Sequence, residues 1–164
     1  MDWDSRYRSG GARAEPHRLA VEAARMFSPG RALDLACGAG RNARYLAERG
    51  WQVTAVDLSV AALQLARMPR MVVADLERDA TPFRNEQFDL ILIINFLHRP
   101  LFADALRVLH GGGAIAAAIR TTGSYSLPPG ELRGHFAECR IVVEREGEIV
   151  AIKNSAASDR SASS

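Results

Sequence analysis

Hydrophobic residues along this chain follow two alternating periods. Short apolar runs bounded by turn residues predict buried strands, and segments with apolar residues three or four positions apart predict amphipathic helices. The predicted strands cover residues 31–36, 51–57, 71–75, 88–94 and 114–120. The predicted helices cover residues 17–27, 43–50, 59–67, 101–109 and 128–138. Two β-rich segments follow within 140–154 and meet at Gly147, which predicts a closing hairpin.

The alternation of strands and helices predicts an α/β fold. Parallel strands joined by right-handed helical crossovers build a doubly wound, Rossmann-like sheet with helices on both faces. The runs at 88–94 and 114–120 lack polar alternation, as central strands covered on both faces do. We expect one domain over residues 1–153, and a disordered tail over the low-complexity residues 154–164.

Some of the connections carry signals of their own. Ser59 is the expected N-cap of the helix that follows it. No full helix fits between Asp75 and Phe88, so this crossover is expected to be a loop or a single turn. We expect the fourth predicted helix to end at the glycines 111–113. Pro128 is expected to open the last helix, because proline is tolerated in a first turn.

Composition narrows the class of protein. The formal net charge is +2, and the arginines that supply it are scattered, so no basic footprint for nucleic acid is visible. Cys37 and Cys139 do not make a disulfide scaffold, and no Cys/His cluster has metal-ligand spacing. The N-terminus lacks a signal-peptide core, and the longest apolar run, 90–97, is too short to span a bilayer. We expect a cytoplasmic monomer or homodimer with no nucleic-acid or membrane partner.

The stretch LDLACGAGRN, from Leu33 to Asn42, places a glycine turn after the first strand. In a doubly wound sheet, ligands bind outside the carboxyl ends of the strands, at the switch point beside the first strand. Gly38 and Gly40 let the backbone approach a ligand closely, and the following helix presents its amide end. With Ala43 they also satisfy the permissive motif G-x-G-x-x-A, so an NAD-dependent oxidoreductase is one alternative.

Three acids at the ends of neighbouring strands favour another ligand. Asp34 lies inside the first strand, where a carboxylate repels a pyrophosphate but suits an ammonium group. Asp57 ends the second strand and can accept hydrogen bonds from ribose hydroxyls. Asp75 ends the third strand and can accept from an adenine amino group, while the Leu76 amide donates to a ring nitrogen. A ligand with an amine, a ribose and an adenine, but no phosphate, is S-adenosylmethionine.

The segments that carry these acids resemble a known family. ALDLACGAGRNARYLAERGWQVTAVDLS looks like the first two motifs of class I S-adenosylmethionine-dependent methyltransferases, and VVADLE and FDLILIINFLHRPLFADALRVLHGGGAI look like the later ones. GRNARYLAERGWQVTAVD, PPGELRGHF and the opening WDSRYRSG resemble the tellurite-resistance TehB-type group and its small-molecule methyltransferase relatives. The resemblance is specific from Ala32 to Ile119 and looser to Lys153. It implies a seven-stranded sheet whose last strand is antiparallel.

The resemblance also implies a set of cofactor-binding residues. The glycine turn would line the methionine end of the cofactor, the Asp57 segment the ribose and the Asp75 segment the adenine. Residues 1–30 would form a lid and a helix, with Trp3 and Tyr7 folded over the site. The expected cofactor-binding residues are Trp3, Tyr7, Asp34, Ala36, Cys37, Gly38, Gly40, Asn42, Asp57, Leu58, Asp75, Leu76 and Asn95.

Several of these residues also have a purely structural interpretation. Asp34 would cap its own turn, and Asp57 would cap the following helix. Asp75 would belong to a solvated loop, because Glu77 and Asp79 follow it. Cys37 is interpreted as a small packing residue rather than a nucleophile.

The expected activity is methyl transfer from S-adenosylmethionine to a small molecule. The sulfonium already activates the methyl group, so the protein chiefly aligns an acceptor and excludes water. The candidate catalytic residues are Asn95, His98, Arg99 and Arg120, the last three as guides for an anionic acceptor. No metal is expected.

The residues at the end of the fourth predicted strand restrict the range of possible methyl acceptors. It lacks the Asn/Asp-Pro-Pro-aromatic motif of amino-methylating nucleic-acid enzymes. The remaining acceptors are tellurite or a related oxyanion, a thiol, or another small metabolite. A non-catalytic S-adenosylmethionine-binding module is the second hypothesis, because the shortened connections leave the acceptor side thinly covered.

Overall fold

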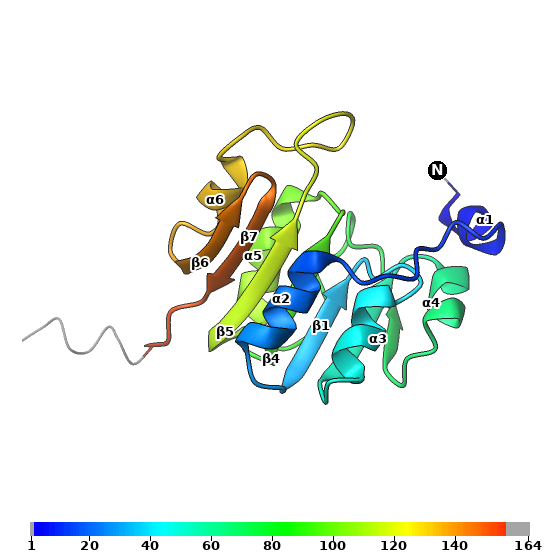
Figure 1. Cartoon of the computed structure of the whole chain (residues 1–164), viewed down its shortest axis with the longest axis horizontal. Coiled ribbons are helices and arrows are strands. Elements are labelled where there is room, and N and C mark those ends of the chain that lie inside the picture. The colour runs from blue at the N-terminus through cyan, green and yellow to red at the C-terminus, as the bar shows by residue number, and fades with distance from the viewer. Residues whose placement is uncertain (1, 157–164) are drawn as a thin grey trace, which may run out of the picture.

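The computed structural model describes residues 2–156, so most of the predicted tail, 154–164, lies outside the described residues. Seven strands form one sheet in the order β3-β2-β1-β4-β5-β7-β6 (Figure 1). The strands are β1 Arg31–Leu35, β2 Gln52–Asp57, β3 Met71–Val73, β4 Phe88–Ile94, β5 Leu109–Ala118, β6 Arg140–Arg145 and β7 Glu148–Ile152. The pairs among β1 to β5 are parallel, and β7 is antiparallel to both β5 and β6. The predicted α/β sheet, with its antiparallel hairpin about Gly147, is confirmed.

Helices cover both faces of the sheet (Figure 1). They are α1 Trp3–Arg8, α2 Arg18–Met26, α3 Arg41–Ala47, α4 Val60–Ala66, α5 Arg99–Val108 and α6 Glu131–His135. Side chains alternate between the two faces along each strand. In β4, Leu90 and Leu92 pack toward α2, α3 and α4, whereas Ile91 and Ile93 pack toward α5 and α6. This double coverage explains why β4 is apolar on both faces.

The crossover between β3 and β4 contains no helix, as expected from the sequence. The α5 side chains Arg107 and Asp104 hold this connection in place. The Arg107 guanidinium donates to the Thr81 and Phe83 carbonyl oxygens, and Asp104 accepts a 2.7 Å hydrogen bond from the Thr81 backbone N–H. Leu76 is buried with the α5 face of the core. The connection is therefore an ordered loop.

Two predicted helix boundaries are wrong. The helix before the glycines ends at Val108, and the glycines 111–113 lie inside β5. A register shift between β4 and β5 brings Gly113 within 2.9 Å of the Asp89 carbonyl oxygen, measured from the place a Cβ would take, so the strand has no room for a side chain there. Pro128 does not open α6, because the helix begins only at Glu131, with Gly130 as its N-cap.

Candidate functional site

The glycine turn lies at the carboxyl edge of the sheet, between β1 and α3. Ala36, Gly38 and Gly40 all have positive φ angles, of 56°, 56° and 77° respectively. Gly40 is the N-cap of α3, so the amide end of this helix faces the turn. Cys37 is buried beside it, and burial raises the pKa of its thiol far above the ordinary value, which fits the packing interpretation.

Asp34 is a buried carboxylate in the middle of the sheet. Its side chain is 1% exposed, and its Oδ2 has no hydrogen-bond partner among the described residues. Burial, and then the charge of Asp57, raise its pKa from 3.8 to about 7, against a hydrogen bond from the Ala43 backbone N–H. Burying a carboxylate oxygen without a hydrogen-bond partner costs free energy, and a cationic ligand group paired with this oxygen would offset that cost.

Asp57 closes the second strand and contacts the turn directly. Its Oδ2 accepts a 2.8 Å hydrogen bond from the Gly38 backbone N–H, and its Oδ1 accepts a 2.9 Å bond from the Ser59 N–H. Burial raises the pKa of this carboxyl group. Asp57 itself is half-buried, and the adjacent Leu58 is 50% exposed. Asp57 therefore links the glycine turn to Ser59, the N-cap of α4.

The third acid, Asp75, lies in the loop after β3. It is half-buried, and its Oδ1 accepts a 3.1 Å hydrogen bond from the Glu77 backbone N–H. The Leu76 side chain points into the core. Asp34 thus lies one residue before the end of β1, and Asp57 ends β2. Asp75, expected to end the third strand, follows β3 by two residues, so the three acids belong to adjacent strands at one edge of the sheet.

Asn42 has a structural task that the sequence did not reveal. Its side chain is 4% exposed and its Oδ1 accepts a 2.8 Å hydrogen bond from the His17 backbone N–H. The bond ties the start of α2 to α3. Its role at the cofactor stays a prediction.

The N-terminal helix α1 lies over this edge, beside α4 (Figure 1). The Tyr7 hydroxyl lies against Gly38: a Cβ added there would approach the oxygen more closely than van der Waals contact allows, and the ring carbon Cζ would be 3.3 Å away. Burial and the charge of Asp57 raise the Tyr7 pKa. Trp3 is 40% exposed and stacks with the Arg6 guanidinium, whose carbon lies 5.4 Å from the ring centroid.

Asp4 was missed by the sequence reasoning, although it lies between Trp3 and Tyr7 in the opening motif. Its Oδ1 accepts hydrogen bonds from the Ser59 hydroxyl and, at 3.3 Å, from the Ala61 backbone N–H. These bonds fasten α1 to the first turn of α4 and lower the Asp4 pKa. The one sign in the sequence that could have indicated this role is the presence of an aspartate inside the opening motif.

The four candidate catalytic residues lie at the ends of β4 and β5. Asn95 follows β4 in a left-handed conformation with φ 57°, and its N–H donates to the Ala118 carbonyl oxygen at 2.7 Å. His98 is the N-cap of α5 and makes no side-chain capping bond. The Arg99 guanidinium is paired with Glu131 of α6, at 2.5 and 3.1 Å. Arg120 follows β5 and is exposed.

Two structural features are absent from residues 2–156. No cluster of three or more His, Cys, Asp or Glu side chains there is arranged to hold a metal ion. Within the same residues, no helix has both the length and the apolar character needed to cross a membrane.

The site therefore has the features that S-adenosylmethionine requires. The orphaned Asp34 oxygen suits an ammonium group, and Gly38 and Gly40 leave the backbone exposed to a close approach. Asp57 and Asp75 offer carboxylate oxygens at the next two strand ends. Together with the strand order, these features define a Rossmann-like fold with a nucleoside-binding edge.

Similarity to known proteins assigns the chain to a family. The chain belongs to the methyltransferase domain family, which it matches over residues 33–117. It is 39% identical over 101 residues to a malonyl-[acyl-carrier protein] O-methyltransferase of Salmonella typhimurium, a match that covers 56% of this chain and 39% of that protein. The chain thus spans well under half the length of this relative.

Two solved structures share the fold. TehB from Haemophilus influenzae superposes with a TM-score of 0.73 at 20% identity, over 92% of this chain and 66% of that one. The Burkholderia thailandensis 1,6-didemethyltoxoflavin-N1-methyltransferase, solved with 1,6-didemethyltoxoflavin and S-adenosylhomocysteine, gives a TM-score of 0.70 at 21% identity, over 94% and 86%. Membership of the methyltransferase family is thus confirmed, and the likeness to TehB is one of fold.

Proposed function

We propose that this protein transfers a methyl group from S-adenosylmethionine to a small molecule. The observation that carries the proposal is the unpartnered buried oxygen of Asp34 beside the glycine turn. The family match and the fold support it, because the match includes the turn and the β4 strand.

The residues of the edge divide the cofactor among them. Asp34, Gly38 and Gly40 would hold the methionine end, and Asn95 would face both this end and the acceptor. Asp57 would hold the ribose through the oxygens that now bind the Gly38 and Ser59 N–H groups. The exposed Leu58 would lie against the ring system, and Asp75 and the Leu76 backbone would hold the adenine edge.

When bound, S-adenosylmethionine supplies an electrophilic methyl carbon, which an acceptor lone pair takes as the carbon–sulfur bond breaks and S-adenosylhomocysteine remains. The protein contributes alignment and the exclusion of water. Tyr7 and the rest of α1 would close the site, since the Tyr7 hydroxyl already lies on the turn. The acceptor would be a small molecule, and the candidates that follow from the sequence are an oxyanion such as tellurite, a thiol or another metabolite.

Calorimetry tests the cofactor directly. S-adenosylhomocysteine, S-adenosylmethionine and NAD are titrated separately into the full chain. We expect both adenosyl ligands to bind and NAD to give no heat. Preference for NAD would sink the proposal in favour of an oxidoreductase. Tight adenosyl binding without methyl transfer to any acceptor in a radiolabelled screen would favour a non-catalytic binding module.

A further inference from the structure

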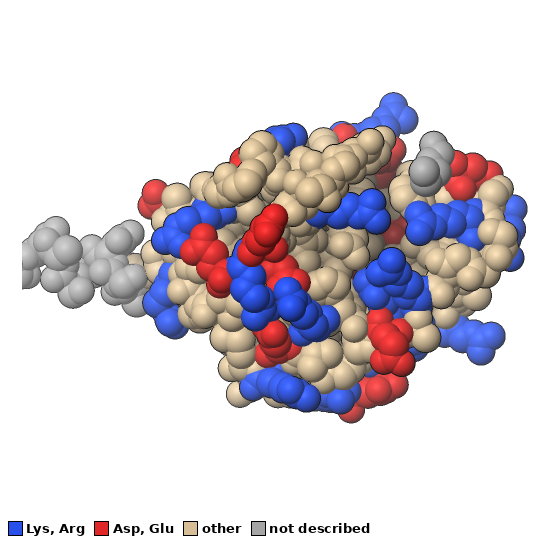
Figure 2. Space-filling view, turned by 45° about the horizontal axis from the view of Figure 1, so that its top comes forward, with Lys and Arg blue, Asp and Glu red and all other residues tan. Residues whose placement is uncertain are grey.

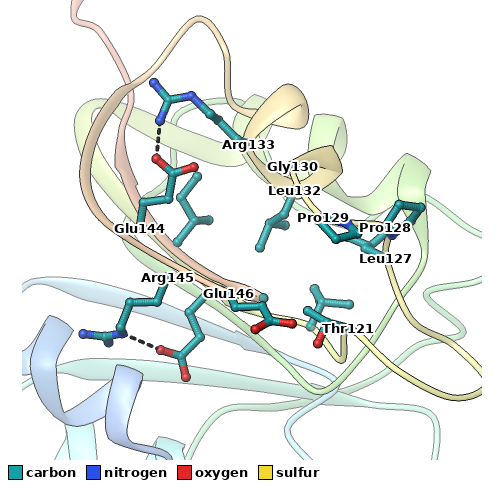
Figure 3. Close-up of a pocket in the computed structure, with 14 residues that line it drawn as sticks. Thr121, Leu127, Pro128, Pro129, Gly130, Leu132, Arg133, Glu144, Arg145 and Glu146 are labelled. Carbon is teal, nitrogen blue, oxygen red and sulfur yellow. Dashed lines mark hydrogen bonds and ion pairs between the residues drawn. The ribbon is translucent and has the colours of Figure 1, made fainter.

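A pocket of about 380 Å³ lies at the same edge of the sheet as the glycine turn, on the side of β5 and β7 (Figure 3). Its walls are the residues after β5, the segment leading into α6, and the β6–β7 hairpin. Because β1 and β5 are parallel and both contact β4, the pocket begins about 10 Å along the sheet from the turn. Asn95, at the end of β4, lies between the two strands.

The pocket is built from fixed elements. The Ile119 N–H donates a 2.7 Å hydrogen bond to the Gly147 carbonyl oxygen, which fastens the hairpin turn to the end of β5. The Leu127 N–H donates at 2.9 Å to the Arg120 carbonyl oxygen and closes the loop above it. The volume of the pocket lies in the lower part of the range for small-molecule sites, which is about 300–1,000 Å³.

The floor of the pocket is apolar, with Thr121 as a single hydroxyl among hydrocarbon side chains. The apolar lining residues are Ile119, Leu127, Pro128, Pro129, Leu132 and Ile149. Such a surface favours a ligand with a hydrocarbon or aromatic body.

The charges around the pocket are already matched, with one exception. Arg133 pairs with Glu144, and Arg145 pairs with Glu148 (Figure 3). Arg145 also pairs with Glu22 of α2. Each of these two arginines therefore already has a carboxylate partner. Among the described residues, Glu146 has neither an ion pair nor a side-chain hydrogen bond. The unmatched charge of the lining is therefore negative.

On the face drawn in Figure 2, basic and acidic side chains lie interspersed. Arg120 follows Ile119 and is exposed, but it is not among the residues that line the pocket.

We propose that this pocket holds the body of the methyl acceptor, and that the acceptor is an organic molecule with a ring-sized apolar body and a neutral or cationic polar group, not an oxyanion. The inference rests on the proposed methyl transfer. An oxyanion would meet an apolar floor and the unpaired Glu146 carboxylate, and both arginines of the lining already have a carboxylate partner. A neutral ring fills the pocket with no such cost.

Three probes that share one ring separate the alternatives. Benzylamine, benzyl alcohol and benzoate are titrated into ¹⁵N-labelled protein saturated with S-adenosylhomocysteine, and amide shifts are followed. We expect the amine and the alcohol to shift the amides of Thr121, Leu127 and Gly147, with millimolar affinity for fragments of this size. Benzoate is expected to bind at least threefold more weakly than benzylamine. Shifts confined to residues outside the lining would overturn the pocket assignment.

Glu146→Lys tests the charge. Glu146 is exposed in the hairpin turn, so the change should leave the fold intact. We expect benzoate to become the better ligand of the pair, with the affinity for S-adenosylhomocysteine unchanged. Glu48→Lys, at the end of α3, makes the same change of net charge away from the pocket and should leave the order as in the wild type. An unchanged order in Glu146→Lys would contradict the assigned charge.

Leu132→Trp tests whether the pocket serves methyl transfer. The larger ring fills the pocket, and a normal S-adenosylhomocysteine affinity reports that the variant has folded. We compare S-adenosylhomocysteine release with hydroquinone and with tellurite as acceptors. The lone pair of a hydroquinone oxygen bonds to the methyl carbon, the carbon–sulfur electron pair stays on sulfur, and the phenolic proton passes to water.

The outcomes separate the two proposals. We expect release with hydroquinone in the wild type, none with tellurite, and at least a tenfold loss in Leu132→Trp. Turnover of tellurite that Leu132→Trp leaves unchanged would overturn the pocket inference and leave the methyltransferase proposal standing. Loss of S-adenosylhomocysteine binding in the wild type would remove both.

Discussion

Asp57 accepts a 2.8 Å hydrogen bond from the Gly38 backbone N–H, so the acid expected to hold a ribose is also a support of the glycine turn. The same carboxylate accepts from the Ser59 N–H at 2.9 Å. Both carboxylate oxygens therefore already accept hydrogen bonds from backbone N–H groups in the chain without a ligand. A substitution at Asp57 has to affect stability and binding together.

Asp57→Ala should weaken S-adenosylhomocysteine binding by on the order of 2 kcal/mol, through the loss of charge-assisted hydrogen bonds. It should also lower the free energy of unfolding, because the Gly38 and Ser59 N–H groups lose their acceptor. Calorimetry and urea unfolding measure the two effects.

Asp89→Ala is the matched control for this change. Asp89 also accepts from the backbone of a neighbouring strand, the Arg31 N–H at 2.9 Å, but at the amino end of β1. It should cost stability and leave the affinity unchanged. Equal affinities in wild type and Asp57→Ala would remove the ribose assignment.

Asp34→Asn should make the protein more stable at pH 8 and a poorer binder. The carboxyl group titrates near 3.8 in the unfolded chain and at about 7 in the folded one. The folded state therefore binds more protons between these values, and stability falls as the pH rises through this window. The asparagine carries no charge, so we expect a gain of at least about 1 kcal/mol above pH 7.

Binding should depend on pH in the opposite sense. An ammonium group prefers the ionised Asp34, so the S-adenosylhomocysteine affinity of the wild type should rise as the pH increases from 5 to about 7. Asp34→Asn should bind more weakly and lose most of this dependence. Titrations at pH 5, 6, 7 and 8 compare the two proteins, and identical pH profiles would show that Asp34 does not face the ligand.

The sequence predicts the strands well because their apolar runs depend on burial alone. β4 and the β6–β7 hairpin lie where the pattern places them. The pattern of apolar residues did not predict the start of β5, because glycines occupy this part of the strand. Gly113 is needed where the Asp89 carbonyl oxygen comes close, and that contact depends on the register between β4 and β5, which the local sequence does not show. The Asn42 bond to His17 and the Asp4 bond to Ser59 join residues 25 and 55 positions apart, so local patterns did not indicate them.

Asp4→Ala should loosen α1 and speed the release of S-adenosylhomocysteine. The change removes the acceptor for the Ser59 hydroxyl and the Ala61 N–H, which hold α1 on α4. We expect lower hydrogen-exchange protection of the Ser9 amide and a dissociation rate at least threefold higher. Asp4→Asn keeps one oxygen acceptor and should lie between the two.

Arg8→Ala is the control for α1. Arg8 lies on the same helix and is exposed, and among the described residues its side chain forms one ion pair, with Asp4 at 3.4 Å. Such pairs contribute little, so protection and dissociation should stay close to the wild type. An unaltered dissociation rate in Asp4→Ala would mean that α1 does not cover the ligand.

Gly38→Ala and Tyr7→Phe should be coupled in stability. A Cβ at Gly38 would collide with the Tyr7 hydroxyl, whereas the ring carbon behind it lies at 3.3 Å, a contact that a small shift relieves. Alanine at a φ of 56° adds a conformational cost of about 1–2 kcal/mol that does not depend on the side chain of the tyrosine. Gly38→Ala should therefore cost more in the wild type than in the Tyr7→Phe background, by about 0.5 kcal/mol or more. Gly112→Ala, at φ 85° with nothing within 4 Å, should cost the same in both backgrounds. Urea unfolding of the cycle without ligand measures the coupling, and equal costs for Gly38→Ala in the two backgrounds would show that Tyr7 does not rest on the turn in solution.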